Sequence, residues 1–214
     1  MARVKICGIN DAPAFDAAAE AGADWIGFVF FPASPRFVTP AAAAALSARH
    51  TGGPQRVGLF VGATDTDIAA VLDALPLDAL QLYDTPTRIA EIAQRFGLPV
   101  WHAVPFDPST DLPTEAGAAD AILIEPRAPA GATRPGGNAV IFDWSRMRGW
   151  KPPFPWLLAG GLTPTNVADA IKASGARAVD VSSGVETAPG RKSPALIAAF
   201  VRAANAIEQR SASF

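Results

Sequence analysis

Apolar residues in this 214-residue chain gather in short, nearly continuous runs, and longer alanine-rich segments separate those runs. A short apolar run that alternates with a helix-like segment is typical of a buried parallel strand followed by a helix. Eight runs fit strands, at residues 4–7, 25–30, 56–61, 79–82, 99–104, 121–124, 155–159 and 178–181. Six segments between and after them fit helices, at residues 12–21, 40–49, 66–75, 86–96, 164–173 and 193–207.

Eight strands alternating with helices predict an α/β protein, a single (β/α)8 TIM barrel rather than an open doubly wound sheet. The length suits one such domain, which we place at residues 1–208, with a short C-terminal tail at 209–214 that we expect to fray. Only the connections after the fifth and sixth strands look irregular. Their proline-rich stretches, 105–113 and 126–135, fit loops because the strand pattern resumes after each.

Each predicted helix has a side chain that can cap it at or near its start, often with a proline suited to the first turn. These starts are Asp11, Thr39-Pro40, Asp65, Thr85-Pro86, Thr163-Pro164 and Ser193-Pro194. Asp143 precedes Trp144 in the same manner, so we expect Asp143 to cap a helix rather than take part in catalysis.

Composition narrows the class of partner. Half of the residues are apolar, the formal net charge is −2, and no basic block is present, which gives no electrostatic basis for binding nucleic acid or an anionic membrane. No apolar stretch is long enough to predict a transmembrane helix. We therefore expect a small-molecule partner.

The cysteine count and the N-terminus bear on location. A single cysteine, Cys7, excludes an intrachain disulfide, and Met1 to Arg3 lead directly into the first strand without room for a signal peptide. These features predict a cytoplasmic protein. His50 and His102 have no further metal ligands near them in the sequence, so we predict no metal site.

Glycine and small polar residues follow the last two strands, at Gly160-Gly161 and at Ser182-Ser183-Gly184. Glycine lets backbone N–H groups approach an anion, and the loops after strands seven and eight of such barrels commonly bind phosphate. A tight turn would explain each glycine taken alone. Their occurrence at two adjacent strand ends favours a phosphate site formed by Gly160, Gly161, Ser182, Ser183 and Gly184.

The first strand ends at Cys7, and strand alternation places Lys5 on the same face. A lone cysteine is usually a small buried apolar residue. At the carboxyl end of a barrel strand and beside a cation, however, a thiol can have a lowered pKa and act as a base. Asp180 lies in the eighth strand, which closes against the first, so we expect it to pair with Lys5 in a structural role.

A series of motifs occurs in order along essentially the whole chain. The motifs are Lys5-Ile6-Cys7-Gly8, Gly27-Phe28-Val29-Phe30 with Ser34-Pro35-Arg36, Val57-Gly58-Leu59-Phe60-Val61, Leu80-Gln81-Leu82, Phe142-Asp143-Trp144, Ala159-Gly160-Gly161-Leu162 with Asn166-Val167, and Val179-Asp180-Val181-Ser182-Ser183-Gly184-Val185-Glu186. Together they resemble the phosphoribosylanthranilate isomerase family of tryptophan biosynthesis. The resemblance implies a (β/α)8 fold and an Amadori rearrangement of an aminoaldose phosphate to an aminoketose phosphate, without metal or organic cofactor.

The resemblance also implies roles for three residues. Cys7 matches the general base that takes the C2′ proton of the open-chain Schiff base. Glu125 follows the sixth strand, where the family has an aspartate that protonates the furanose ring oxygen; the alternative is a solvated loop carboxylate. Arg36 matches an arginine that contacts the anthranilate end of the substrate, although a loop arginine is most often simply solvated.

Other positions depart from the family pattern. Tyr83-Asp84 stands where histidine and glycine are usual. Gly136-Gly137-Asn138-Ala139, preceded by several prolines, stands where a small-residue run rich in glycine is usual. Two further hypotheses therefore stay open: a diverged paralogue that acts on or binds another phosphorylated sugar, and a catalytically weak barrel kept as a ligand-binding protein. The outer helices present no decisive apolar stripe, so the sequence does not predict an oligomeric state.

Overall fold

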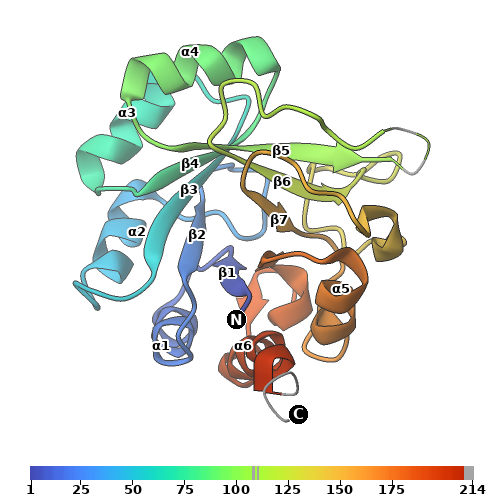
Figure 1. Ribbon diagram of the computed structural model, residues 1–214. Coiled ribbons are helices and arrows are strands. Elements are labelled where there is room, and N and C mark those ends of the chain that lie inside the picture. The colour runs from blue at the N-terminus through green and yellow to red at the C-terminus, as the bar shows by residue number, and fades with distance from the viewer. Residues whose placement is uncertain (108, 110, 210–214) are drawn as a thin grey trace.

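The computed structural model describes residues 1–107, 109 and 111–209, and contains the predicted closed barrel of eight parallel strands (Figure 1). Each strand pairs with its sequence neighbour, and the first also pairs with the eighth, with Lys5 opposite Asp180. The eight predicted strands are confirmed to within two residues at their ends. They are β1 (Arg3–Cys7), β2 (Trp25–Val29), β3 (Gln55–Val61), β4 (Ala79–Tyr83), β5 (Val100–Phe106), β6 (Ala121–Pro126), β7 (Trp156–Leu158) and β8 (Ala178–Val181).

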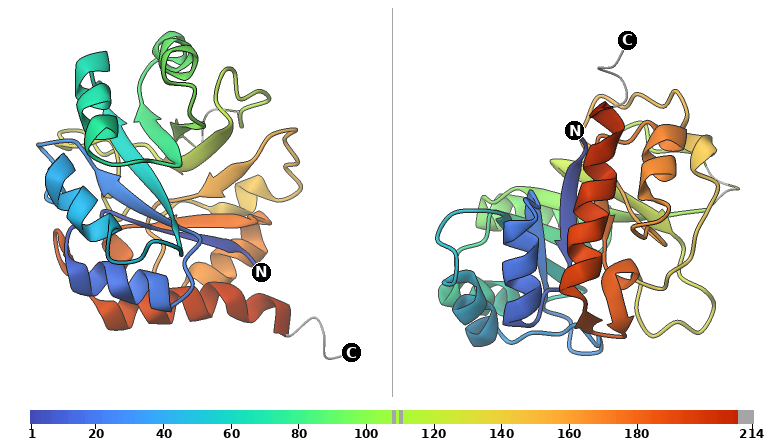
Figure 2. Two further views of the ribbon diagram at one scale, coloured as in Figure 1. Left: turned by 90° about the vertical axis from the view of Figure 1, so that its left-hand side faces the viewer. Right: turned by 90° about the horizontal axis from the view of Figure 1, so that it is seen from below.

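The six predicted helices also form, and they pack around the outside of the barrel. They are α1 (Ala12–Glu20), α2 (Pro40–Ser47), α3 (Asp65–Ala74), α4 (Pro86–Phe96), α5 (Val167–Ser174) and α6 (Pro194–Gln209). Figure 2 shows α1 and α6 side by side along β1. The main apolar core fills the space between strands and helices. The predicted tail starts inside α6 at 209, and its remaining residues, 210–214, lie outside the described part of the chain.

Two predicted helix caps were wrong. Helix α3 is capped by Thr64 instead of Asp65, because the Thr64 hydroxyl and the Asp67 carboxylate form a reciprocal capping box. Helix α5 begins at Val167, three residues after Pro164. The preceding residues form a turn instead, in which the Asn166 amide accepts the Thr163 N–H at 2.7 Å and donates to the Gly161 carbonyl at 3.0 Å.

The connections after β5 and β6 are irregular, as predicted. Among the described residues, no helix lies between β5 and β6, and only the short 3-10 helix η1 (Trp144–Met147) lies between β6 and β7. Asp143 caps η1 as expected, accepting the Ser145 N–H at 3.0 Å. After β8 the chain forms a second 3-10 turn, η2 (Ser183–Val185), and a small hairpin of β9 (Glu186–Ala188) and β10 (Arg191–Lys192).

Three carboxylates hold the N-terminal end of the barrel together. Asp24, Asp78 and Asp120 each stand directly before an even-numbered strand and accept a backbone N–H from the preceding strand. The donors are Val4, Arg56 and Val100, at 2.7–2.8 Å. These aspartates are therefore structural. Within the described residues, no helix has the length and apolar character needed to cross a membrane.

Candidate active site

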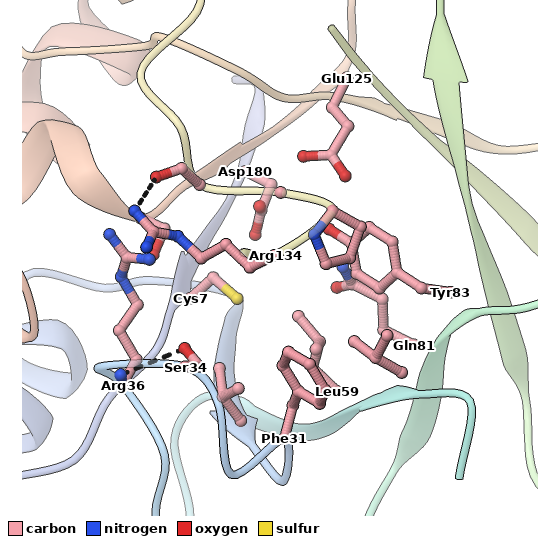
Figure 3. Close-up of a pocket in the computed structure, with 16 residues that line it drawn as sticks. Cys7, Phe31, Ser34, Arg36, Leu59, Gln81, Tyr83, Glu125, Arg134 and Asp180 are labelled. Atoms are coloured by element: carbon pink, nitrogen blue, oxygen red, sulfur yellow. Dashed lines mark hydrogen bonds between the residues drawn. The ribbon is translucent and has the colours of Figure 1, made fainter. Parts of the chain in front are cut away.

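A small cavity with mixed polar and apolar walls lies at the C-terminal end of the barrel (Figure 3). It is lined by Cys7, Val29, Phe31, Ser34, Arg36, Leu59, Val61, Gln81, Tyr83, Glu125, Arg134, Pro135, Gly136, Gly137, Asp180 and Ser182. A larger cavity of about 860 Å³ opens at the N-terminal end among Trp25, Trp101 and Trp156, but the carboxylates there, Asp78 and Asp120, already accept backbone N–H groups. The reactive groups are thus concentrated at the C-terminal mouth, as the fold predicts.

Lys5 is the fixed cation beneath this cavity. Its side chain is fully buried, and its ammonium donates to Asp180 at 2.7 Å and to Gln81 at 2.8 Å, so the predicted Lys5–Asp180 pair is present. Burial opposes the charge, yet attraction to Asp180 and Cys7 raises the pKa of Lys5 above its ordinary value. Gly27 makes room for this arrangement, since a Cβ there would lie 3.0 Å from the Cys7 sulfur and 3.2 Å from the ammonium.

Cys7 is buried and lines the cavity, but its pKa is not lowered as the neighbouring lysine suggested. Burial raises the pKa of the thiol above its ordinary 9.0, and the attraction of Lys5 only partly offsets this effect. The expectation of a lowered pKa is therefore wrong for the ligand-free protein. A sequence shows that a cation is near a thiol, but the extent of desolvation depends on everything packed around it.

Glu125 is a buried acid. Its side chain is 5% exposed, so the alternative of a solvated loop carboxylate is wrong. Burial raises its pKa from 4.5 to about 8, outweighing the hydrogen bond with Tyr83 that lowers it. Glu125 therefore carries its proton at neutral pH. Its Oε1 has no hydrogen-bond partner among the described residues, and Figure 3 shows the carboxyl group pointing into the cavity.

The departures from the family pattern lie together around this acid. Tyr83 is partly buried beside Glu125, and desolvation raises the pKa of its phenol well above 10, so the hydroxyl keeps its proton. Gly136 covers both side chains, because a Cβ at that residue would lie 2.5 Å from the Tyr83 hydroxyl and 2.6 Å from Glu125 Oε2. The longer acid, the tyrosine and the altered loop thus form one packed unit.

Arg36 is buried rather than solvated, and its guanidinium is already paired. It donates from Nε and Nη2 to the two oxygens of Glu186, at 2.7 and 2.9 Å. Lys192, also buried, donates to the same carboxylate at 2.9 Å and to the Ser182 carbonyl at 2.9 Å. Burial by itself would raise the pKa of Glu186, but the two cations lower it by more, so its pKa lies below the ordinary value. This cluster joins the loop after β2 to the loop after β8.

The glycines predicted to bind phosphate have a structural requirement of their own. Gly160 and Gly161 have positive φ angles, 89° and 61°. A Cβ on Gly184 would lie 1.8 Å from the Leu162 carbonyl oxygen, so only glycine allows the loops after β7 and β8 to meet. Ser182 lines the cavity, and Ser183 and Gly184 open η2, where the first N–H groups of a helical turn have no partner within the turn.

Sequence reasoning assigned no role to Gln81, Arg134, Glu186 or Lys192. Gln81 and Glu186 lie within the family-like motifs, which was a usable signal. Lys192 had none, because its contact with Glu186 depends on the hairpin that turns the chain back. Arg134 lies in a proline-rich loop, and nothing in its spacing indicates that it reaches the cavity.

The fold and this site define a (β/α)8 barrel with a buried acid and a thiol facing one cavity at the carboxyl ends of the strands. The family model for N-(5′-phosphoribosyl)anthranilate isomerase matches residues 4–203. The chain therefore belongs to that family.

Individual relatives agree over nearly the full length. The chain is 54% identical over 206 residues to N-(5′-phosphoribosyl)anthranilate isomerase of Acidiphilium cryptum, covering 96% of this chain and 100% of the relative. The crystal structure of TrpF from Jonesia denitrificans superposes with a TM-score of 0.83 at 37% identity, covering 97% and 98% of the two chains. Another solved isomerase, described in complex with reduced 1-(o-carboxyphenylamino)-1-deoxyribulose 5-phosphate, has a TM-score of 0.77 at 32% identity, over 96% of this chain and 100% of that one.

Proposed function

We propose that this chain isomerises N-(5′-phosphoribosyl)anthranilate to 1-(2-carboxyphenylamino)-1-deoxyribulose 5-phosphate, the Amadori rearrangement of tryptophan biosynthesis. Membership of the isomerase family supports the reaction class. The observation that carries the proposal is the buried Glu125, which holds its proton at neutral pH and faces the cavity that Cys7 also lines.

The reaction needs an acid that protonates the ring oxygen and a base that removes the proton from C2′. Glu125 donates its proton to the furanose ring oxygen, the C1′–O bond breaks, and the nitrogen lone pair forms the C1′=N bond of a protonated Schiff base. The Cys7 thiolate then takes the proton from C2′, and the electrons of that C–H bond become the C1′=C2′ bond of an enolamine, neutralising the nitrogen. Cys7 then returns its proton to C1′, and the C2′ hydroxyl gives its proton to the Glu125 carboxylate. These transfers form the ketone and restore both groups, so the product is an isomer of the substrate.

The positive charge on the Schiff base favours the second step. A cation next to a thiol stabilises the thiolate, so the pKa of Cys7 falls when the iminium forms beside it. Lys5 adds to this effect from below, where Asp180 and Gln81 hold its ammonium in place. In the ligand-free site most Cys7 side chains keep their proton, and the fraction that carries a thiolate is the reactive form.

The phosphate of the substrate is assigned to the ends of β7 and β8. Gly160, Gly161, Ser182, Ser183 and Gly184 would contribute backbone N–H groups and hydroxyls there. The positive φ angles of the two glycines and the open start of η2 support this assignment. Lys192, which donates to the Ser182 hydroxyl at 3.2 Å, would add a nearby positive charge.

The proposed reaction is tested directly by incubating the purified protein with N-(5′-phosphoribosyl)anthranilate and following product, and by complementing a tryptophan auxotroph that lacks this isomerase. Turnover with growth is the expected result. Binding of the phosphorylated product analogue without turnover would instead favour the ligand-binding alternative, and turnover confined to another phosphorylated sugar would favour the diverged paralogue.

The role of Cys7 is tested by Cys7→Ser. A serine hydroxyl is far less acidic than a thiol, so kcat should fall by about two orders of magnitude or more, while the reduced product analogue still binds within a few-fold of wild type. Steady-state kinetics and calorimetric titration measure the two quantities. A near wild-type kcat in Cys7→Ser would show that Cys7 is not the general base.

A further inference from the structure

Arg134 enters the cavity from the long connection between β6 and β7. It is one of the lining residues, and Figure 3 shows its side chain extending over the cavity toward the side of Arg36. Its Nη2 donates to the Gly137 carbonyl at 3.3 Å, and its carbonyl accepts from the Asn138 amide at 3.2 Å, so the loop folds back on itself around this residue.

The guanidinium of Arg134 is incompletely satisfied. Its Nε is buried and has no hydrogen-bond partner within the described part of the chain. An arginine carries five N–H donors and no acceptor, so a buried donor without a partner costs free energy unless a ligand provides an acceptor. The wall of the cavity therefore contains a cation with hydrogen-bonding capacity to spare.

Arg36 is in a different situation. Two of its nitrogens hold Glu186, and the third, Nη1, lies against Gly137, where an added Cβ would come within 2.7 Å. Both arginines thus touch Gly137, which brings two positive charges close together. Glu186 also binds Lys192, so Arg36 and Lys192 share one carboxylate. Arg134 has no carboxylate partner among the described residues, and its guanidinium donates to the Gly137 carbonyl instead.

We propose that Arg134 binds the carboxylate on the aromatic ring of the substrate and is the residue that makes the site specific for a carboxylated arylamine. This inference rests on the proposed function and assigns to Arg134 the contact that the family resemblance placed on Arg36. A planar guanidinium meets a carboxylate with two parallel hydrogen bonds, and an additional anion balances the excess positive charge beside Gly137. Arg36, held by Glu186, acts by positioning the loop that carries Gly137.

The test uses two ligands that differ only in the carboxylate: reduced 1-(o-carboxyphenylamino)-1-deoxyribulose 5-phosphate and the same compound with an unsubstituted phenyl ring. Calorimetric titration of the wild-type protein should show tighter binding of the carboxylated ligand by about ten- to a hundredfold, the effect of a charged hydrogen-bonded pair. In Arg134→Met this ratio should fall to within about threefold of one, with the affinity for the phenyl ligand nearly unchanged.

Matched variants separate this role from others. Arg127→Met removes an exposed arginine of the same connection and should leave the ratio as in wild type. Arg134→Lys should restore only part of the ratio, because an ammonium cannot form the bidentate contact. A ratio retained in Arg134→Met but lost in Arg36→Met would overturn the inference and return the contact to Arg36. An equal loss of affinity for both ligands in Arg134→Met would overturn it as well, since the residue would then not contact the carboxylate specifically.

Failure of this inference is distinguishable from failure of the proposed function. Turnover by wild type together with unchanged discrimination in Arg134→Met rejects only the role of Arg134. A wild-type protein that neither turns over N-(5′-phosphoribosyl)anthranilate nor binds the carboxylated ligand rejects both.

Discussion

Glu125 must be protonated and Cys7 deprotonated for the reaction to proceed. Burial raises the pKa of both groups. Burial gives the acid a pKa of about 8 and raises the pKa of the thiol above 9.0. Both groups are therefore protonated in most molecules near pH 7. The acid is ready to donate, whereas the base forms only in the fraction of molecules that have lost the thiol proton.

These directions predict the pH dependence of kcat/KM, which reports on the free enzyme. The rate should rise with pH below about 8 as thiolate accumulates, level off above about 8 as Glu125 ionises, and fall above the pKa of Cys7. In Glu125→Gln, kcat should drop by about two to four orders of magnitude, because the amide has no acidic proton. Its residual rate should keep rising through pH 8. A Glu125→Gln profile with wild-type rate and shape would show that the carboxyl group is a bystander.

The same residue should affect stability. The pKa of Glu125 is about 8 when folded and near 4.5 when exposed, so its contribution to stability is fully present below about pH 4.5 and is lost as the pH rises through 8. The loss is at most about 1.4 kcal/mol per pH unit across that interval. Glutamine does not titrate. The free energy of unfolding in urea should therefore be higher for Glu125→Gln, relative to wild type, at pH 8 than at pH 5. The same difference between the two proteins at both pH values would refute the raised pKa.

At the scale of elements, the connection between β6 and β7 determines the environment of the site. It contributes Gly136 against Glu125, Gly137 against Arg36, and Val140 and Ile141 against Gly161. The segment therefore shields the acid from water and covers one of the proposed phosphate-binding glycines. Ala139 lies within it at φ 57°, the one non-glycine residue in the described chain with a positive φ.

Relieving this backbone conformation should stabilise the protein. An L-residue in the left-handed region costs about 1–2 kcal/mol, and the added freedom of glycine in the unfolded chain offsets about 0.4–1 kcal/mol of the gain. Ala139→Gly should thus raise the free energy of unfolding by about 1 kcal/mol. The control, Ala45→Gly on the exposed side of α2, should lower it by a similar amount. Chemical denaturation measures both, and a destabilised Ala139→Gly would mean that the loop is not strained at this position.

At the scale of the whole molecule, the ion pair between Lys5 and Asp180 joins the first strand to the eighth and so lies on the seam that closes the barrel. Lys5→Met leaves a carboxylate buried without its cation and should cost about 3–5 kcal/mol of stability. Lys5→Met combined with Asp180→Asn should recover part of the loss, because the amide is uncharged and can bond to Gln81. Thermal and denaturant unfolding of both variants test this, and a fully stable Lys5→Met would show that the pair contributes little.

The architecture and most of the reactive side chains of the site could be predicted from the sequence. Strand and helix positions followed from local hydrophobic periodicity, which acts over a few residues and is visible in the chain. The ends of the strands in turn located Cys7, Glu125 and the glycines at one mouth of the barrel. The start of α5 was predicted wrongly because Thr163 does not cap the helix. The Asn166 side chain bonds to the Thr163 N–H and the Gly161 carbonyl, and these bonds hold the residues before Val167 in a turn.

The protonation and pairing of the charged groups in the site depend on the folded structure. The pKa of Cys7 and of Glu125 depends on desolvation by segments distant in sequence, above all the connection that carries Gly136. The same is true of pairing: Arg36 meets Glu186, 150 residues away, while Arg134 keeps a buried donor without a partner. Charge and residue type are local properties of a chain, but the free energy of a charge is set by what surrounds it, and that environment exists only after folding.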